Sequence, residues 1–545
     1  MSEMATGAPL LSIRDLRIDG RVGEDWQPIL KGVDLTLAPG EVLGLIGESG
    51  AGKSTLGLAA MGFVRDGCRF AGGTVTYKGK ELTGASRAER RALRSSEIAY
   101  VAQSAAASFN PAHTLLAQYA EFPVLRGRMS AREAEADAAK MYARLKLPDP
   151  DGIGFRYPHQ VSGGQLQRAM TAMAMACRPA LIIFDEPTTA LDVTTQIEVL
   201  AAIREAVDEM GTAAIYVTHD LAVVAQMAHR IMVLRYGEMV EEAETRQMLT
   251  RPQKDYTKSL WAVRAFKTEE KTAPAPGTTP LLSLQSINAG YGAAKILSDV
   301  SFDIAEGRTV AVVGESGSGK STVARVITGL LPPMSGSVAF DGKPLPGALA
   351  RRSKDQLRHT QMIYQMADTA LNPKQRLRKI IGRPVAFYLG LSGRALEARI
   401  CELLEEIELD PDTFIDRFPA ELSGGQKQRI GIARALAAEP RFIICDEVTS
   451  ALDQLVAEGI LKLLDRLQRT RGLTYMFITH DIATVRAIAD DVVVMKEGKI
   501  VEWGPKANVL AEPHPPYTEL LLSSVPQMDP DWLSGVLASR TATSR

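Results

Sequence analysis

One nine-residue loop occurs twice in this chain, and the two copies constrain its fold more than any other feature. The loop reads GESGAGKST from Gly47 to Thr55 and GESGSGKST from Gly314 to Thr322. Both copies fit G-x-x-x-x-G-K-[ST], a turn whose backbone N–H groups surround a polyphosphate. An apolar, strand-like run precedes each copy and a helix-forming run follows, which places the phosphates at a helix N-terminus. A flexible glycine turn is the alternative, but it does not explain why the Lys-Ser pair and its context occur twice.

Each loop supplies candidate ligands for a nucleotide and its metal ion. Lys53 and Lys320 would place a cation on the terminal phosphates, and Ser54 and Ser321 would offer a hydroxyl to Mg²⁺. The loops therefore predict a triphosphate ligand and Mg²⁺, and the family resemblance described below implies that the cofactors are ATP and Mg²⁺. The other candidate ATP-binding residues are Gly47, Ser49, Gly50, Gly52 and Thr55 in the first copy, and Gly314, Ser316, Gly317, Gly319 and Thr322 in the second.

The rest of the chain repeats together with the loop. Lys53 and Lys320 are 320 − 53 = 267 residues apart, and the later motifs recur at an offset of 261 residues. A repeat of this length is a duplicated domain. Between the halves lies a stretch rich in Pro, Thr and charge, without apolar periodicity, which is typical of a linker. The predicted order is a first domain at 1–264, a linker at 265–280 and a second domain at 281–545 that includes a C-terminal extension.

Each half alternates predicted strands and helices, the pattern of an α/β domain with a largely parallel sheet. Hairpins should turn at Tyr236-Gly237 and at Glu497-Gly498. A helix should begin near Ser130, where Glu133 three residues later completes a capping box. Its counterpart should begin near Ser392, where apolar residues follow at helical spacing.

An apolar strand in each half ends in two acidic residues, Asp185-Glu186 and Asp446-Glu447. Ligands bind at strand C-termini in such sheets, so the first acid of each pair would hold Mg²⁺. The second would orient and deprotonate the attacking water. A histidine ends the next strand and would hold the water and the glutamate in line. The alternative for the acid pair is an acidic turn after a strand, and the alternative for the histidine is a purely structural role. The candidate catalytic residues are Glu186, His219, Glu447 and His480, and the candidate metal ligands are Asp185 and Asp446 beside the loop serines.

Composition excludes several other classes of protein. The four cysteines form no C-x-x-C pair, which argues against a zinc site or a disulfide framework. A net charge of −1 does not indicate a bulk nucleic-acid binder. The N-terminus lacks the features of a signal peptide. No run of ~18 apolar residues occurs, so the chain is expected not to cross a membrane.

A serine, two glycines and a glutamine open a helix in each half, at 162–165 and 423–426. The serine would cap the helix, and the bare glycine N–H groups can approach a phosphate. With the other motifs, these residues resemble the ABC ATPase family, whose signature is LSGGQ, and the resemblance covers nearly the whole chain. The signature residues are Ser162, Gly163, Gly164 and Gln165, and Ser423, Gly424, Gly425 and Gln426.

The resemblance implies two tandem ABC-type P-loop NTPase domains. Each would have a RecA-like core, an antiparallel β subdomain and a helical signature subdomain. It also implies that each SGGQ stretch binds the γ-phosphate of an ATP held by the other half. One such unit holds half of each active site, so this chain would form an intramolecular pseudo-dimer.

Further family motifs follow in the expected order. Gln103 and Gln365 match the Q-loop, which contacts Mg²⁺ and water where the transmembrane partner docks. Tyr291 matches the aromatic residue that stacks on adenine. The first half has no aromatic residue at the matching spacing, which leaves Trp26 as an open substitute. The D-loop motifs are Ala190-Leu191-Asp192 and Ala451-Leu452-Asp453.

The resemblance narrows to the peptide and nickel importer branch. SFNP from Ser108 and ALNP from Ala370 follow the Q-loops, and RPQKDYTKSL from Arg251 and EPHPPYTELL from Glu512 end the halves. This implies an ATP-hydrolysing energy-coupling subunit of a binding-protein-dependent importer. It would be peripheral, at the cytoplasmic face of the bacterial inner membrane. Its partners would be two transmembrane permease subunits and a periplasmic or extracellular substrate-binding protein. Some relatives carry a cysteine cluster for iron, which is missing after both halves, so no iron is expected.

The segments after the two Q-loops differ, SAAASFNPAH against MADTALNPKQ, which predicts two unlike permeases. Phe109 and Leu371 are predicted as apolar docking contacts there. The alternatives are a soluble double-ABC protein that acts on ribosomes or DNA, and half of an exporter. The short linker and the missing zinc, coiled-coil and membrane segments speak against both, and no nucleic-acid partner is expected. The cargo stays open among peptides, nickel complexes, glutathione, opine-like compounds and peptide antibiotics.

Overall fold

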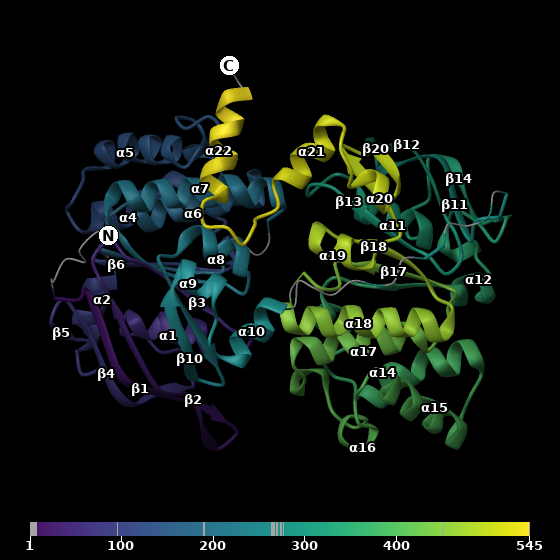
Figure 1. The fold of residues 1–545 in the computed structure, drawn as a ribbon, viewed down its shortest axis with the longest axis horizontal. Helices are drawn as coiled ribbons and strands as arrows, with labels where there is room; N and C mark the ends of the chain where they lie inside the picture. The colour runs from purple at the N-terminus through teal and green to yellow at the C-terminus, as the bar shows by residue number, and fades with distance from the viewer. Residues whose placement is uncertain are drawn as a thin grey trace. The chain divides into compact units, whose positions relative to one another are not determined.

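A computed structural model describes residues 8–94, 96–188, 191–262, 268, 271–272, 275, 277–450 and 452–543. The chain divides into two compact units (Figure 1), and each is described by itself. Unit 1 comprises Met1–Ala262 together with Pro526–Arg545, and unit 2 comprises Val263–Val525. The division near Ala262 lies close to the expected end of the first domain. Ala190 and Ala451 of the D-loops and parts of the predicted linker lie outside the described residues.

The core of unit 1 is a six-stranded sheet in the order β10-β9-β3-β8-β7-β6. Neighbouring strands pair in parallel, except for the antiparallel edge pair β9 and β10. The central strands β3, β7 and β8 are buried throughout, as continuous apolar runs in a parallel sheet require. The strands are β3 Val42–Ile46, β6 Ile98–Val101, β7 Leu181–Asp185, β8 Ala213–Val217, β9 Arg230–Arg235 and β10 Glu238–Glu244.

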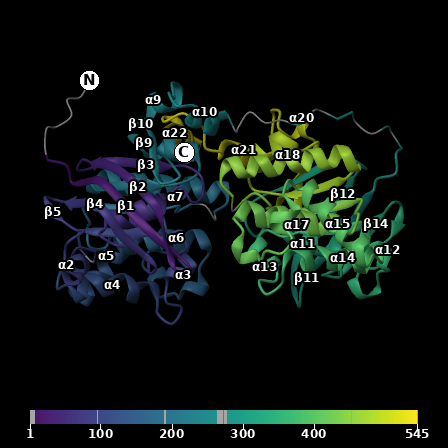
Figure 2. The same ribbon diagram turned by 90° about the horizontal axis from the view of Figure 1, so that it is seen from below.

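A second, antiparallel sheet of unit 1 has the strand order β2-β1-β4-β5, and Figure 2 shows β1, β2 and β4 side by side. Its strands are β1 Leu11–Val22, β2 Asp25–Leu37, β4 Cys68–Tyr77 and β5 Lys80–Glu81. The α-helices are α1 Lys53–Ala60, α2 Arg87–Arg94, α3 Ala105–Ser108, α4 Leu115–Leu125, α5 Ala131–Arg144, α6 Gly163–Met175, α7 Val193–Met210, α8 Leu221–Met227, α9 Thr245–Thr250, α10 Asp255–Ala262 and α22 Trp532–Thr543.

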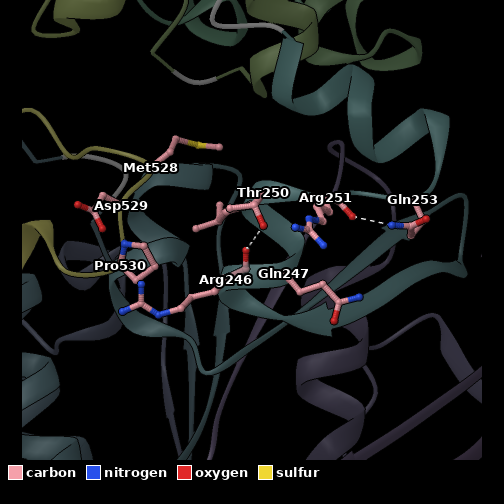
Figure 3. A pocket seen from close by; sticks show the side chains of 9 residues that line it. Arg246, Gln247, Thr250, Arg251, Gln253, Met528, Asp529 and Pro530 are labelled. Carbon is pink, nitrogen blue, oxygen red and sulfur yellow. Dashed lines mark hydrogen bonds between the residues drawn. The ribbon is translucent and has the colours of Figure 1, made fainter.

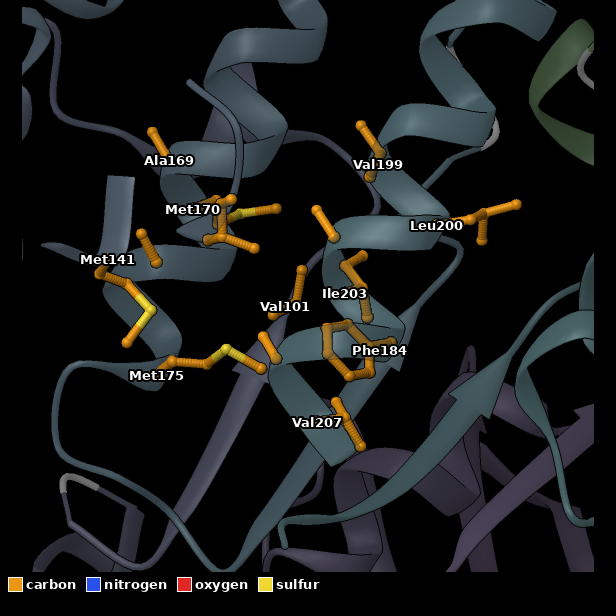
Figure 4. Close-up of a cluster of buried hydrophobic side chains, with 14 of the residues drawn as sticks. Val101, Met141, Ala169, Met170, Met175, Phe184, Val199, Leu200, Ile203 and Val207 are labelled. Carbon is orange, nitrogen blue, oxygen red and sulfur yellow. The ribbon is translucent and has the colours of Figure 1, made fainter. Parts of the chain in front are cut away.

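One apolar cluster joins the core sheet of unit 1 to its helical part (Figure 4). Val101 and Phe184 enter it from the sheet, Met141 and Met170 from α5 and α6, and Ile203 from α7. All five side chains are buried. The helix that carries the signature residues is thus fixed on the strand that ends in the acid pair.

Unit 2 repeats this architecture. Its core sheet has the order β16-β17-β18-β13-β19-β20, and its antiparallel sheet has the order β12-β11-β14-β15. The strands are β11 Leu282–Tyr291, β12 Ala294–Ile304, β13 Thr309–Val313, β14 Ser335–Phe340, β15 Lys343–Pro344, β16 Thr360–Ile363, β17 Phe442–Asp446, β18 Thr474–Ile478, β19 Asp491–Lys496 and β20 Lys499–Pro505. The α-helices are α11 Lys320–Thr328, α12 Lys354–His359, α13 Ala367–Ala370, α14 Leu377–Pro384, α15 Gly393–Glu406, α16 Pro411–Phe414, α17 Gly424–Leu436, α18 Gln454–Arg471, α19 Ile482–Ile488, α20 Lys506–Val509 and α21 Pro516–Ser523.

The predicted local features are confirmed. The hairpins turn at Tyr236-Gly237 and Glu497-Gly498, where the backbone has positive φ. Ser130 and Glu133 form the expected capping box of α5, and Ser392 is the N-cap of α15. The predicted fold class, two α/β domains each with a largely parallel core sheet, an antiparallel sheet and a helical part, is confirmed as well.

The C-terminal tail lies in unit 1, whereas the sequence assigned it to the second domain. Figure 1 shows α22 against α7, and Leu533 of α22 is fully buried. Gln226 of α8 holds the tail, because its amide donates to the carbonyls of Gln527 and Asp529, each at 2.8 Å. The Leu533 N–H in turn donates to the Gln226 side-chain oxygen at 3.0 Å. The tail is thus an integral part of unit 1.

The tail also forms one wall of a cavity of about 780 Å³, shown in Figure 3. Its other wall is α9 and the residues that follow it. Arg246 of α9 lies beside this cavity and forms an ion pair with Asp531 of the tail at 2.7 Å. The lining residues are Arg246, Gln247, Leu249, Thr250, Arg251, Gln253, Met528, Asp529 and Pro530.

A matching contact exists in unit 2. Thr268 donates from its N–H to the carbonyl of Ala487 in α19 at 2.8 Å. The repeat offset relates both partners to the tail contact, since 268 + 261 = 529 and 226 + 261 = 487. After the first half, the chain contacts α19 of unit 2, and after the second half it contacts α8 of unit 1. These two helices occupy the same place in the repeat.

Within the described part of the chain, no helix combines the length and the apolar character that crossing a bilayer requires.

Candidate nucleotide-binding and hydrolysis site

The two glycine-rich loops have nearly the same backbone geometry. Gly47 has φ 147° and Gly314 has φ 149°, in a region that L side chains rarely adopt. A Cβ atom on either would lie 2.1 Å from a carbonyl oxygen of the neighbouring strand, that of Leu234 or Met495. Only glycine therefore fits where the loop leaves β3 or β13 and passes β9 or β19.

The loop lysines are buried and held by their own loops. Lys53 Nζ donates to the carbonyls of Gly47 at 2.7 Å and Glu48 at 2.9 Å. Lys320 Nζ donates to those of Gly314 and Glu315, both at 2.7 Å. Each lysine is also the first residue of the helix that follows its loop. Both loops thus place a cation over the turn that would surround a phosphate.

The predicted metal ligands of unit 1 meet at one point. Ser54 Oγ donates to Asp185 Oδ1 at 2.8 Å, and the Tyr100 hydroxyl donates to Asp185 Oδ2 at 2.6 Å. A hydroxyl and a carboxylate in contact are hard oxygen ligands that suit Mg²⁺. Sequence reasoning missed Tyr100, whose only signal is its place three residues before Gln103. The corresponding residue of unit 2 is Met362, which has no hydroxyl.

In unit 2 the same pair is looser. Ser321 Oγ lies 3.4 Å from Asp446 Oδ1. Burial raises the pKa of Asp446 to about 6, and the charge of Glu447 acts in the same direction, while Ser321 and Lys320 oppose the shift. A bound cation would favour the charged carboxylate and reverse this shift. The site therefore fits a divalent cation in composition.

The predicted catalytic glutamate of unit 1 lies between the Q-loop glutamine and the histidine. Gln103 Nε2 donates to Glu186 Oε2 at 2.9 Å, and His219 Nδ1 lies 3.2 Å from Glu186 Oε1. Each carboxylate oxygen thus has its own partner, which fixes the orientation of the group. The glutamine contacts this glutamate rather than the Ser54–Asp185 pair. In unit 2 the corresponding distances are 2.5 Å from Gln365 to Glu447 and 3.4 Å from His480 to Glu447.

Electrostatics couple these groups. Burial alone would lower the pKa of His219, but its hydrogen bond to Glu186 and the charge of that residue raise the pKa above its ordinary value. His480 responds to Glu447 in the same way. Burial raises the pKa of Glu447, yet the hydrogen bond and charge of His480 bring it below the ordinary value. In both units the glutamate thus raises the pKa of the histidine, and in unit 2 the histidine in turn lowers the pKa of Glu447.

Both glutamates also have strained backbones. Glu186 has φ 51° and Glu447 has φ 48°, the left-handed region that non-glycine residues seldom adopt. Such strain costs on the order of 1–3 kcal/mol and is concentrated at functional sites. The turn after the strand redirects the second acid toward the glutamine and the histidine.

The signature residues form reciprocal caps. Ser162 Oγ accepts from the Gln165 N–H at 3.3 Å, and Gln165 Oε1 accepts from the Ser162 N–H at 3.1 Å. Ser423 and Gln426 make the same pair at 3.3 and 3.0 Å. The predicted serine caps are confirmed, and the glutamines complete capping boxes. The pairing of each signature with the loop of the other half stays a prediction.

The two glycines of each signature differ in their surroundings. A Cβ atom on Gly164 would lie 2.3 Å from Thr195 Cγ2, and one on Gly425 would lie 2.4 Å from Val456 Cγ1. A Cβ atom on Gly163 would meet no atom within 4 Å. The second glycine is therefore required for helix packing, while the first leaves open space at the helix start.

We expect Gly425→Ala to destabilise the protein by roughly 1–3 kcal/mol, because Val456 is β-branched, stiff in a helix and unable to yield. Gly424→Ala is the matched control, since its Cβ atom would lie 3.7 Å from the nearest atom, Leu452 Cδ2. It should leave stability unchanged or raise it slightly. Thermal unfolding midpoints of the two variants measure the difference, and equal midpoints would refute the packing argument.

The adenine-stacking candidates differ between the units. Tyr291 is exposed, and its hydroxyl accepts from Arg325 of α11, the helix that follows the second loop, at 2.5 Å. Trp26 of β2 is exposed as well, with the Arg69 guanidinium 4.2 Å from its ring centroid. Neither ring is buried in the protein core.

Two predicted docking contacts are wrong. Phe109 is 5% exposed and Leu371 is 2% exposed, so both side chains lie in the apolar clusters of their helical parts. The exposed apolar side chains on either side of Gln365 are instead Tyr364, which precedes it, at 43% and Met366, which follows it, at 56%. The sequence showed that Phe109 and Leu371 are apolar but not which way they face.

The ABC transporter family model matches residues 30–189 and again 297–450, and each match spans a loop, a signature and an acid pair. The chain belongs to the ABC transporter ATPase family. As an ABC transporter ATPase it binds and hydrolyses ATP. A second model, the C-terminal region of oligopeptide/dipeptide transporters, matches residues 501–544.

Similar proteins cover almost the whole length of this ABC transporter ATPase. The glutathione import ATP-binding protein of Salmonella choleraesuis is 38% identical over 562 residues, which is 96% of this chain and 90% of that protein. Its counterpart from Escherichia coli K12 is 36% identical over 570 residues, with the same coverage. Among solved structures, cbiO1 of Clostridium perfringens, part of an ABC transporter complex, is 30% identical with a TM-score of 0.39, and covers 43% of this chain and 92% of that one.

Proposed function

We propose that this protein is the ATP-hydrolysing subunit of a binding-protein-dependent importer for peptides or related small molecules such as glutathione. The match of residues 501–544 to the C-terminal region of oligopeptide/dipeptide transporters carries this proposal. The full-length similarity to glutathione import ATP-binding proteins supports it. Two glutamine–glutamate–histidine clusters, each in the same unit as a phosphate loop, agree with two hydrolytic sites rather than one.

Each loop would bind the phosphates of one ATP. The backbone N–H groups surround the phosphates, and Lys53 or Lys320 neutralises part of their charge. Ser54 with Asp185, and Ser321 with Asp446, would hold Mg²⁺, which when bound neutralises charge on the phosphate oxygens. The contacts of these hydroxyl and carboxylate groups support this assignment.

The glutamates would orient the attacking water and take its proton. Glu186 accepts from Gln103 at one oxygen and contacts His219 at the other, so its carboxylate is held in one orientation. Glu447 has the same two partners in unit 2. A positioned base of this kind contributes roughly 10²–10⁴-fold to a rate.

The signature of each half would complete the site of the other. Ser423 and Gly425 would meet the nucleotide on the first loop, and Ser162 and Gly164 the nucleotide on the second, in an intramolecular pseudo-dimer. Because both halves belong to one chain, closure occurs at an effective concentration on the order of mM for a flexible linker. The open space beside Gly163 supports close approach of a phosphate there.

The membrane partners would be two permease subunits, with a separate binding protein that delivers the cargo. The protein would be peripheral, at the cytoplasmic face of the bacterial inner membrane. The segments after the Q-loops would receive the permeases. Their exposed side chains differ, with Met366 in unit 2 against Ala106, Ala107 and Ser108 in unit 1. Unlike surfaces support two unlike permeases.

We expect Met366→Asp to abolish most of the uptake of labelled glutathione and small peptides, while the affinity for ATP stays at the wild-type level. A charge would enter an apolar contact without a partner, but the side chain is 56% exposed and is not one of the residues proposed to bind ATP, although it follows Gln365 in the sequence. Uptake is measured in cells that also produce the permease partners, and nucleotide affinity is measured in parallel with the purified protein.

Met334→Asp is the matched control, because this methionine is 53% exposed and lies away from the Q-loop, just before β14. It should transport normally. Normal uptake by Met366→Asp would place the docking surface elsewhere. Failure of the wild-type protein to support uptake of any peptide-like compound with its permeases would refute the proposed function.

A further inference from the structure

A tyrosine of each C-terminal motif reaches the phosphate loop of its unit. Tyr256 of α10 and Tyr517 of α21 occupy the same place in the repeat, since 517 − 256 = 261. The Tyr256 hydroxyl accepts from the Glu48 N–H at 3.4 Å, and the Tyr517 hydroxyl accepts from the Glu315 N–H at 3.1 Å. Both contacts join residues more than 200 positions apart, and the two units make them independently.

The residue that each tyrosine holds is the second residue of the loop, which also contacts the loop lysine. Lys320 Nζ donates to the Glu315 carbonyl at 2.7 Å, so one residue links Tyr517 to the cation. Glu48 links Tyr256 to Lys53 in the same way, at 2.9 Å on the lysine side. Only one residue therefore separates each tyrosine hydroxyl from the phosphate-binding lysine, so a change at the hydroxyl can affect the position of the lysine.

The tyrosines are themselves held firmly. The Arg235 guanidinium lies 4.4 Å from the ring centroid of Tyr256, and Lys496 Nζ lies 5.0 Å from that of Tyr517. These cations end strands β9 and β19, beside the loops. Next to Tyr517, the buried Thr518 donates to Glu502 of β20 at 2.7 Å. The motif is thus anchored on the sheet by other groups, which leaves the hydroxyl to act on the loop.

We propose that Tyr256 and Tyr517 are positioning residues of the two nucleotide sites. Each phenol hydroxyl fixes the second residue of its loop, so that the loop already has its phosphate-binding shape before ATP arrives. This inference rests on the proposed phosphate-binding role of the loops and extends it to the C-terminal motif. Preorganisation lowers the ordering cost of binding. Loss of the hydroxyl should therefore weaken ATP binding and leave the hydrolytic step unchanged.

Affinity is measured at one loop at a time with a fluorescent ATP analogue. In a chain with Lys53→Ala, only the second loop retains its lysine, and Tyr517→Phe should raise the Kd of that site roughly three- to tenfold, the range expected for one hydrogen bond. In a chain with Lys320→Ala, Tyr256→Phe should have a smaller effect, because its hydrogen bond is longer, 3.4 against 3.1 Å. Phenylalanine keeps the ring, so the unfolding midpoint should fall by no more than about 2–4 °C, the effect of one lost hydrogen bond.

Turnover separates positioning from a structural role. In the otherwise wild-type chain, Tyr256→Phe with Tyr517→Phe should raise the KM for ATP several-fold and leave kcat within about twofold. The matched control is Thr518→Val, which removes the neighbouring hydroxyl without touching the loop. It should leave both constants unchanged.

Unchanged affinity for the analogue in Tyr517→Phe overturns the inference. An equal loss of affinity in Thr518→Val also overturns it, because it would show that anchoring of the C-terminal motif on the sheet, and not the tyrosine hydroxyl, determines affinity. Loss of kcat without a change in KM also overturns it. The proposed phosphate-binding role of the loops has its own test. If Lys53→Ala together with Lys320→Ala leaves binding of the analogue intact, the loops do not bind the phosphates, and the proposed role of the loops and that of the tyrosines both fail.

Discussion

A chain carrying both Glu186→Gln and Glu447→Gln should hydrolyse ATP roughly 10²–10⁴-fold more slowly than the wild type. Glutamine keeps the size of each side chain but cannot take a proton from water. In both units the carboxylate lies between a glutamine and a histidine, so no other group in the cluster is placed to replace it. Steady-state phosphate release measures the loss, and nucleotide affinity should persist.

Each single substitution should by itself remove a large part of the turnover, because both clusters are complete. Glu238→Gln is a suitable control, since that side chain is 64% exposed on the edge strand β10. It should hydrolyse ATP normally. Wild-type turnover in either Glu186→Gln or Glu447→Gln would show that the altered site does not contribute to ATP hydrolysis, contrary to the two-site proposal.

Leu371→Asp should destabilise unit 2 by at least ~3 kcal/mol, which combines the loss of buried apolar contacts with the burial of a carboxyl group. Leu371 is 2% exposed and belongs to the same apolar cluster as Leu377 and Ile381. Phe109→Asp should have a comparable effect on unit 1, where Phe109 is 5% exposed. The thermal unfolding midpoint should fall, and limited proteolysis should cut the helical part first.

Met366→Asp is the control for this prediction as well, because a surface change should alter stability by no more than ~0.5 kcal/mol. Transport would fail in both Leu371→Asp and Met366→Asp, but only the first should lower the unfolding midpoint. If Leu371→Asp unfolds at the wild-type temperature, the leucine is not packed as described, and its original assignment as a docking contact regains support.

Features with a local sequence signal were predicted well. The loops, the hairpin turns at Tyr236-Gly237 and Glu497-Gly498, the capping box of Ser130 and the serine caps of the signatures depend on residues a few positions apart. Their patterns therefore contain most of the information that determines their shape. The strand ends that carry Asp185 and Asp446 follow from the same reasoning, because a parallel sheet collects its strand C-termini at one edge.

Features that depend on distant partners were missed. Leu371 follows α13, a helix of only four residues, which is too short to show a periodicity that would tell the buried face from the exposed one. Leu533 is buried through contacts with unit 1, and its partner Gln226 lies 307 residues earlier. The tyrosine contacts with the loops span 208 and 202 residues. No local pattern encodes such pairings.

Each tyrosine that contacts a phosphate loop is joined by a short stretch of chain to a residue that is held in the other unit. From Tyr517, which holds the second loop, to Asp529, which Gln226 holds in unit 1, there are 529 − 517 = 12 residues. From Tyr256 to Thr268, held by Ala487 in unit 2, there are again 268 − 256 = 12. Twelve residues span at most ~40 Å when fully extended. Each segment therefore sets an upper limit on the distance between a tyrosine that contacts a phosphate loop and the next residue that is held in the other unit.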